Sequence, residues 1–154
     1  MNSIKNTLIF TEFLKKKIFK KFINTLMIQG KKEKIETILF NVLKRIKKTN
    51  ENPLIIFINA VKNASPLVIV KTVKKRKRIN IIPRIISKTK QINYGILNIV
   101  KFLKKNKKIK TEIFFYSELI KISNNNGDIL NLKKEVYNIA FENKLLVKFN
   151  KQIN

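Results

Sequence analysis

The residues of this sequence that could do chemistry are lysines, which gather in three clusters along the chain. Ammonium groups bind phosphates as point charges, without reading a base sequence. A run of charge is more often only a solvated face, and lysines at a helix C-terminus also complement the helix dipole. The clusters are Lys15-Lys16-Lys17 with Lys20-Lys21 and then Lys31-Lys32-Lys34; Lys71, Lys74, Lys75, Arg76, Lys77 and Arg78; and Lys101, Lys104, Lys105, Lys107, Lys108 and Lys110.

The overall charge indicates what kind of partner these lysines bind. The 154 residues include 35 Lys and Arg against 9 Asp and Glu, a formal net charge of +26. A folded chain with so few acids repels itself, and a polyanionic partner relieves the repulsion. Nucleic acid is the first candidate, and an anionic membrane surface is the second. Hydrophobic residues make up 44% of the chain, enough for a core, and no apolar run approaches the length of a membrane span.

Catalytic and metal-binding chemistry finds little support. Histidine and cysteine are absent, so no imidazole or thiol can ligate a metal or act as a nucleophile. The acids are scattered, and no glycine-rich phosphate loop is present. A lysine nucleophile would leave no signature among so many lysines. We therefore expect that the protein is not an enzyme, needs no cofactor and takes no small-molecule substrate.

Apolar residues at helical spacing predict about six helices. The first carries Phe10 through Leu26 and ends before Gly30, a residue typical of a left-handed helix stop. The third begins at Pro53, with Asn52 as its cap, and finishes before Ser65-Pro66. The others are expected at about 35–46, 92–103, 111–120, where Thr111 could be the cap, and 132–146, after a loop at 124–127.

Between the third and fourth helices, β-branched residues flank a basic run. Segments 67–73 and 79–86 predict two strands, and 74–78 would be their charged tip. Five consecutive cations at a tip have no packing function, which favours phosphate contact there. The predicted fold class is mainly α, with about six helices in one domain, 1–154, and a protruding β-hairpin arm at about 67–86. An isolated hairpin is marginal in water, so the arm is expected to be mobile alone and ordered on RNA.

Aromatic residues give little support for base stacking. The phenylalanines Phe10, Phe13, Phe22, Phe40 and Phe57 fall on apolar helix faces and are expected in the core, while Tyr94, Tyr116 and Tyr137 are ambiguous. No aromatic sheet motif of the ribonucleoprotein type is present. Binding is expected to follow RNA shape and backbone rather than a single-stranded sequence.

Three blocks of sequence carry a more specific signal. They are KFINTLMIQGKK at Lys21 to Lys32, the segment from Phe57 to Lys71 with Ile82-Pro83 beyond it, and VYNIAFENK at Val136 to Lys144. In this order, and at nearly this spacing, they resemble the small-subunit ribosomal protein seven family. The first signature of that family reads K-F-[IV]-N-x-[LI]-M-x-x-G-K-K, and its C-terminal block reads V-x-x-M-A-E-A-N-K-A-F. The chain is similar to an organellar member.

The resemblance implies the same helical body with a β-ribbon, and it also implies a role. Members of the family bind the head domain of small-subunit rRNA, help to initiate head assembly, and lie beside the exit-site tRNA and the mRNA path. The implied partners are small-subunit rRNA, neighbouring head proteins and, transiently near the arm, tRNA and mRNA, with no membrane. Together with the charge clusters, the expected rRNA-binding residues are Lys20, Lys21, Asn24, Lys31, Lys32, Lys71, Lys74, Lys75, Arg76, Lys77, Arg78, Arg84, Asn143 and Lys144.

The chain also departs from the family's pattern. The arm of the family usually turns through Gly-Gly, where this chain has Arg76-Lys77. Long side chains adopt positive φ only at a cost, so the turn type is open. No Asp-Pro-x-Tyr stretch precedes the first block, and Thr11 to Lys17 stand there instead. The arginine-rich start of the fourth helix is reduced to Ser87-Lys88-Thr89-Lys90, and Asn98 replaces an aromatic. Lysine thus replaces most of the bidentate phosphate contacts of arginine.

Composition bears on the compartment. Ile, Asn, Phe and Lys, whose codons are A/T-rich, are abundant, which we attribute to an AT-rich genome such as that of an organelle. We expect a ribosome of the mitochondrial matrix and an organelle-encoded chain, with the plastid ribosome as the alternative. The basic amphipathic segment from Met1 to Lys21 could be a targeting presequence. We interpret it as the first helix, because its pattern runs on unbroken and an organelle-encoded protein needs no presequence.

Two other functions stay open at this point. A basic helical protein that binds or compacts organellar DNA would need a recognition helix with polar base-reading residues, and no such helix is evident. A membrane-surface protein would suit the N-terminal helix. The remaining helices, however, have ordinary core stripes.

Overall fold

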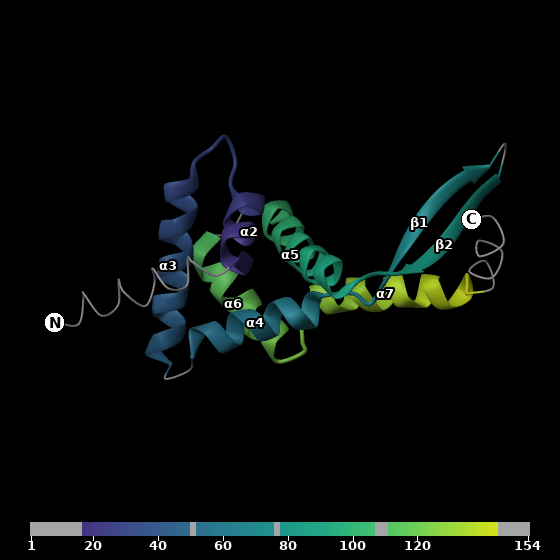
Figure 1. The fold of residues 1–154 in the computed structure, drawn as a ribbon. Coiled ribbons are helices and arrows are strands. Elements are labelled where there is room, and N and C mark those ends of the chain that lie inside the picture. Colours follow the sequence, from purple (N-terminus) through teal and green to yellow (C-terminus); the bar gives the residue numbers. More distant parts are fainter. Residues whose placement is uncertain (1–16, 50–51, 76–77, 107–110, 145–154) are drawn as a thin grey trace.

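The computed structural model describes residues 17–49, 52–75, 78–106 and 111–144, apart from the side chains of residues 75, 78, 79 and 111. Its elements are α2 (Lys17–Leu26), α3 (Lys32–Lys48), α4 (Pro53–Ala64), β1 (Val68–Lys75), β2 (Arg78–Ile85), α5 (Lys88–Lys105), α6 (Thr111–Ser123) and α7 (Asp128–Glu142). The six helices described, with a hairpin between α4 and α5, confirm the predicted mainly α fold. Figure 1 shows α2 to α6 gathered in a body, from which the arm and α7 extend together.

The core of the body is built around α2. Phe22 lies between Phe57 of α4 and Phe115 of α6, with ring centroids 5.3 Å and 5.4 Å away, and Phe19 stacks on Phe57 at 4.3 Å. These rings are fully buried, and each removes a large apolar area from water. Of the phenylalanines predicted in the core, Phe22 and Phe57 are buried, Phe40 is partly buried, and Phe10 and Phe13 lie outside the described residues.

Local chemistry sets several helix ends where the sequence predicts them. Gly30 lies four residues after the end of α2 and has a φ of +71°, which glycine adopts without a Cβ clash; Gln29 before it is also left-handed, at +55°. Asn52 Oδ1 accepts a hydrogen bond from the backbone N–H of Leu54 at 3.1 Å, which caps α4. The same helix ends at Ala64, directly before Ser65-Pro66. Thr111 is the first helical residue of α6, and its role as a cap stays a prediction.

The arm is an antiparallel pair in which Val68 is opposite Ile85 and Lys75 is opposite Arg78. The strands therefore extend further toward the tip than predicted, and Lys74, Lys75 and Arg78 belong to paired backbone rather than to a separate tip. Ladder hydrogen bonds use only backbone atoms, and lysine is well tolerated on edge strands, so the charge does not end the pairing. The turn at Arg76-Lys77 lies outside the described residues.

α7 differs most from its prediction. It ends at Glu142, and Leu146, predicted to belong to it, lies outside the described residues. Leu132 is 53% exposed and Ile139 is also exposed, so the expected core stripe is wrong for these positions. The reason is that α7 leaves the body and lies along the arm, where it packs against β1 (Figure 1).

Hydrogen bonds from α7 fasten the base of the arm. The Tyr137 hydroxyl accepts from the backbone N–H of Leu67 at 2.8 Å. Lys133 Nζ donates to the carbonyl of Asn63 at 2.8 Å, near the end of α4. The side-chain amide of Asn63 in turn donates to the last two carbonyls of α6, at 2.9 Å and 3.1 Å. These bonds join α4, α6 and α7 at the point where the chain leaves the body for β1.

Candidate nucleic-acid interface

One face of α2 presents polar and basic side chains to solvent. Lys17, Lys20, Lys21 and Asn24 are all exposed, at the i, i+3, i+4 and i+7 spacing that shares one helix face. The opposite face is buried in the core. The structure therefore brings three predicted rRNA-binding residues, Lys20, Lys21 and Asn24, together on one surface.

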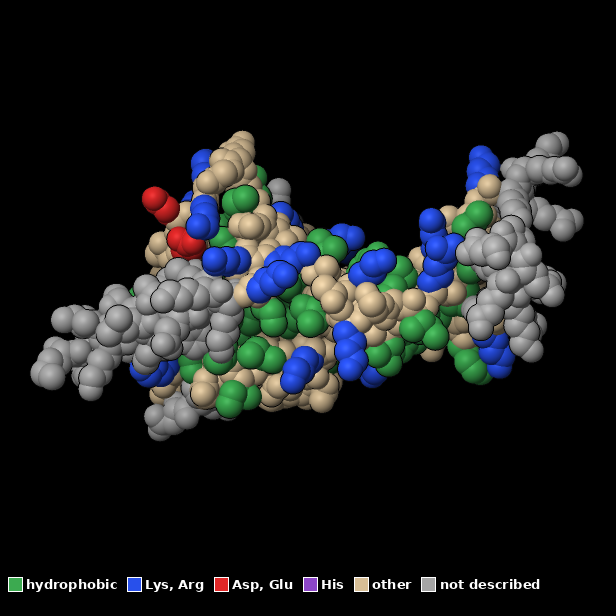
Figure 2. Space-filling model, viewed as in Figure 1, with side chains coloured by type: hydrophobic (Ala, Val, Ile, Leu, Met, Phe, Trp, Pro, Cys, Tyr) green, Lys and Arg blue, Asp and Glu red, His purple; other side chains and the backbone are tan. Residues whose placement is uncertain are grey.

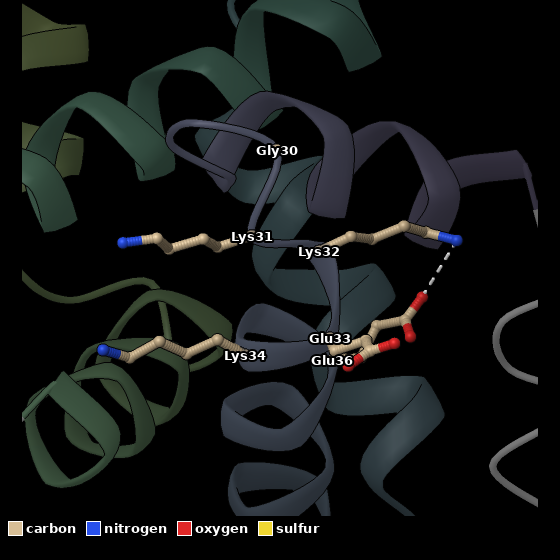
Figure 3. Close-up of a pocket in the computed structure, with 6 residues that line it drawn as sticks. All are labelled: Gly30, Lys31, Lys32, Glu33, Lys34 and Glu36. Atoms are coloured by element: carbon tan, nitrogen blue, oxygen red, sulfur yellow. Dashed lines mark ion pairs between the residues drawn. The ribbon is translucent and has the colours of Figure 1, made fainter.

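Lys31 and Lys32, a predicted pair, extend in different directions where the α2–α3 loop meets α3 (Figure 3). Figure 3 shows Lys31 and Lys34 extending to one side, while Lys32 extends to the other, toward Glu36. Lys32 Nζ lies 3.3 Å from Oε1 of Glu36, one helical turn further on. These residues border an open hollow at the N-terminus of α3. Lys34 thus adds its charge to that of Lys31, whereas the charge of Lys32 is partly offset.

The cations of the arm lie on both of its faces. Cross-strand partners in an antiparallel pair share a face, and neighbours within a strand alternate. Lys71 is opposite Ile82 and Arg84 is opposite Ile69, so Lys71 and Arg84 share a face, and Lys74 lies on the other. All three cations are exposed. Of the other predicted arm residues, Lys75 and Arg78 are described in their backbone alone, and Arg76 and Lys77 lie outside the described residues.

Asn143 and Lys144 follow the end of α7. The Asn143 side chain donates to the carbonyl of Ile139 at 2.8 Å and so closes the last turn of its own helix. Lys144 is exposed, with Nζ 4.2 Å from the ring centroid of Phe141, a cation–π distance. RNA contact by either residue stays a prediction, and Lys144 has the freer polar group of the two.

The third lysine cluster divides between two environments. Lys104 Nζ donates to the carbonyl of Thr25 at 2.9 Å, so it holds the end of α5 against the last turn of α2. The sequence suggested that lysines of this cluster complement the dipole at a helix C-terminus. Lys104 does so at the C-terminus of α2, whose carbonyls attract cations, and not at the end of its own helix. Lys101 and Lys105 are exposed on α5, and residues 107–110 lie outside the described residues.

A fourth basic cluster, at the C-terminal end of α3, was not predicted. Lys44, Arg45, Lys47 and Lys48 are exposed, and the Arg45 guanidinium lies 5.4 Å from the ring centroid of Tyr116. A signal was available, because four of five consecutive residues are cations. They are interrupted by a buried isoleucine, however, and so have the pattern of an ordinary solvated helix face.

Negative charge is scarce over the described residues. Two ion pairs join described residues, Lys32–Glu36 and Lys121–Glu118. The hydrogen bond and charge of buried Glu118 raise the pKa of Lys121 above its ordinary value. Figure 2 shows Lys and Arg spread over the body and arm on one face, while the Asp and Glu side chains seen there gather beside α3. The described surface is therefore largely positive and suits a polyanion.

Other kinds of site are not found in the part of the chain that the structure describes. No group of His, Cys, Asp and Glu there could hold a metal ion. Among the described helices, none has both the length and the apolar character needed to cross a membrane. Exposed cations on α2, on the α2–α3 loop and on the arm thus form the candidate interface.

Comparison with known proteins gives one consistent result. The model of a family described as Ribosomal protein S7p/S5e matches residues 2–144. A 51-residue stretch is 49% identical to small ribosomal subunit protein uS7 of Metamycoplasma arthritidis, covering 32% of this chain and only 33% of that relative. The protein uS7m of Reclinomonas americana is 39% identical over 66 residues, 42% of each chain. With uS7 of Nitrosomonas europaea, the match reaches 130 residues at 28% identity, 84% of this chain and 83% of the relative.

Proposed function

Since the chain belongs to the ribosomal protein S7p/S5e family, we propose that it is a structural, non-catalytic component of the small ribosomal subunit that binds rRNA. In more detail, it binds the head domain of the small-subunit rRNA and helps to nucleate assembly of the head. Its arm lies near the exit-site tRNA and the mRNA path, and neighbouring head proteins are its protein partners. The observation that carries the proposal is the family match over residues 2–144.

The placement of the exposed cations supports this proposal. They lie on α2 (Lys20, Lys21), at the start of α3 (Lys31 just before it and Lys34 in its first turn) and on the arm (Lys71, Lys74, Arg84). A folded body with a projecting arm can contact phosphates that are close in a structured RNA and distant along its sequence. Lysine contacts to phosphate release counterions, so the affinity should fall steeply with salt.

We also propose that the ribosome is that of a mitochondrion. The likeness to uS7m of Reclinomonas americana supports this, as does the abundance of residues with A/T-rich codons. A plastid ribosome is the alternative. Immunoblotting of ribosomes isolated from purified mitochondria and from purified plastids, with an antibody against the chain, separates the two.

A DNA-binding function is the competing candidate, since positive charge alone does not distinguish nucleic acids. It predicts tighter binding to duplex DNA than to small-subunit rRNA when both are compared at the same salt concentration. The rRNA-binding function predicts the reverse order, and titration of the full chain with both nucleic acids decides between them.

Cosedimentation tests the ribosomal role. After detergent lysis, the chain should migrate with the small subunit in a sucrose gradient, and it should stay with that subunit when magnesium is removed to separate the two subunits. Recovery of the chain only as free or membrane-bound protein would contradict the proposal.

A further inference from the structure

An exposed line of residues runs along α5 and has no part in the interface proposed above. Five residues form this α5 stripe, at i, i+4, i+7, i+11 and i+15 of one helix face: Lys90, Tyr94, Leu97, Lys101 and Lys105. All are exposed, and the opposite face of α5 is buried against the core. Cations thus lie at both ends of the stripe, with an aromatic and an aliphatic side chain between them.

Tyr94 is the tyrosine for which the structure shows no internal function. The Tyr137 hydroxyl accepts the Leu67 amide, and the Tyr116 ring lies beneath Arg45. Tyr94 is 36% exposed, and within the described residues its ring and hydroxyl have no comparable partner. Its neighbour on the stripe, Leu97, is 37% exposed. A flat apolar surface is therefore presented to solvent in the middle of a basic helix face.

The positive charge of the stripe and its aromatic ring together indicate what kind of molecule binds there. α5 contains no acidic residue. Lys90 and Lys101 are separated by about 16 Å along the helix axis, so several phosphates of one strand can lie between them. An acidic peptide would match the charge, but its carboxylates are not each coupled to a planar ring that could cover Tyr94. An unpaired nucleotide provides both a phosphate and a base whose face stacks on an aromatic ring.

We propose, resting on the function proposed above, that the α5 stripe binds an unpaired stretch of rRNA. One base stacks on Tyr94 beside Leu97, and the phosphates on either side contact Lys90, Lys101 and Lys105. The stripe ends where Lys104 joins α5 to Thr25 of α2, one helical turn from the exposed Lys21. The contact adds base stacking to an interface that otherwise consists of backbone contacts.

Binding of two RNA probes by the full chain tests the stripe. The first probe is a single-stranded oligoadenylate of about twelve nucleotides with one 2-aminopurine, within the usual size of single-strand sites. The second is a duplex RNA of the same length. Tyr94→Ala and Tyr94→Leu should each weaken binding of the single strand by roughly tenfold and reduce the 2-aminopurine quenching. Tyr94→Phe keeps the ring and should bind like the parent.

Two controls distinguish stacking from a general effect. Leu132→Ala removes an exposed apolar side chain from α7 and should change neither affinity. Binding of the duplex should be the same for all Tyr94 variants. Parent-like binding of the single strand by Tyr94→Ala and Tyr94→Leu would overturn the proposal, as would an equal loss for both probes. A different experiment tests the function proposed above, which would be contradicted if the unchanged chain were absent from the small subunit.

Discussion

The Tyr137 hydroxyl accepts a hydrogen bond from the Leu67 backbone at 2.8 Å, across 70 residues of sequence. Leu67 immediately precedes β1, so this bond ties the arm to α7 at the point where the arm leaves the body. One turn earlier on α7, Lys133 is bonded to the carbonyl of Asn63 at the end of α4. The direction of the arm therefore depends on a helix that follows it in the chain.

Tyr137→Phe should loosen the base of the arm while leaving the body folded. It removes the acceptor for the Leu67 amide, at a cost of about 1 kcal/mol or less, because water can reach this site. Hydrogen exchange should become faster in segment 67–86 and stay unchanged in α2 to α4. Tyr116→Phe removes a hydroxyl far from the arm and serves as the control. Equal exchange of the arm in both variants would show that the bond does not hold it.

Lys133→Met should change how stability depends on pH. Burial lowers the pKa of Lys133 below its ordinary value near 10.5, so the folded state disfavours the protonated amine. This cost is present at neutral pH and is relieved as the pH rises through the lowered pKa toward 10.5. A neutral amine can still donate to Asn63. In urea unfolding, the parent should therefore gain stability relative to Lys133→Met over that range.

Lys121→Met is the matched control for this titration. The pKa of Lys121 is raised by its bond to Glu118, so the stabilisation from that pair is present below 10.5 and lost only above it. The difference between the parent and Lys121→Met should stay constant where the difference for Lys133→Met changes. A constant difference for both variants would contradict the desolvation of Lys133.

Gly95→Ala should destabilise the body, although alanine is the better helix former. A Cβ at Gly95 would lie 2.7 Å from the carbonyl oxygen of Val61 and would also clash with Ser65 Oγ. Separating α4 from α5 should cost about 1–3 kcal/mol in the free energy of unfolding. Adding Ser65→Ala relieves only the hydroxyl clash, so the double variant should recover part of the loss. An undiminished melting temperature in Gly95→Ala would contradict the close packing.

Substitutions at the start of α3 should separate the lysines proposed to contact RNA from the one that is paired. Changing Lys31 and Lys34 together to Gln should weaken rRNA binding and reduce the slope of log affinity against log salt by up to about 2. Lys32→Gln should have the smaller effect per residue, because Lys32 already lies 3.3 Å from Glu36. Salt titrations of both variants provide the measurement. A larger slope change for Lys32→Gln would reverse the assignment.

Neutralising the arm cations tests whether the arm touches phosphate. Changing residues 74–78 to uncharged side chains should leave the helical body folded, because the core lies outside the arm. RNA binding should weaken, with a shallower salt dependence. Circular dichroism checks the fold, and an unchanged salt slope would show that these residues do not contact phosphate.

Features that depend on neighbouring residues could be predicted from the sequence. The cap at Asn52 and the left-handed Gly30 follow from side-chain chemistry within a few positions, and the structure confirms both. The order of helices and the place of the arm follow from apolar periodicity and from the family resemblance. These interactions are local, so a single sequence contains most of the information that determines them.

Features that depend on distant partners were not predicted. Apolar spacing on α7 indicates a buried stripe but not that the helix leaves the body, where Leu132 is exposed. The different directions of adjacent Lys31 and Lys32 are another matter, because the Lys32–Glu36 pair is a local i, i+4 contact that the sequence could have predicted (Figure 3). The contact of Gly95 with α4 depends on how two helices approach. Which cations touch RNA stays a prediction for the same reason.

The decisive measurement is a density map of the intact small subunit that contains this chain. We expect the chain in the head of the subunit, with the exposed face of α2 against rRNA and the arm directed toward the exit-site tRNA. A map in which the chain is absent from the head, or in which Lys20, Lys21 and the arm face solvent, would contradict this expectation.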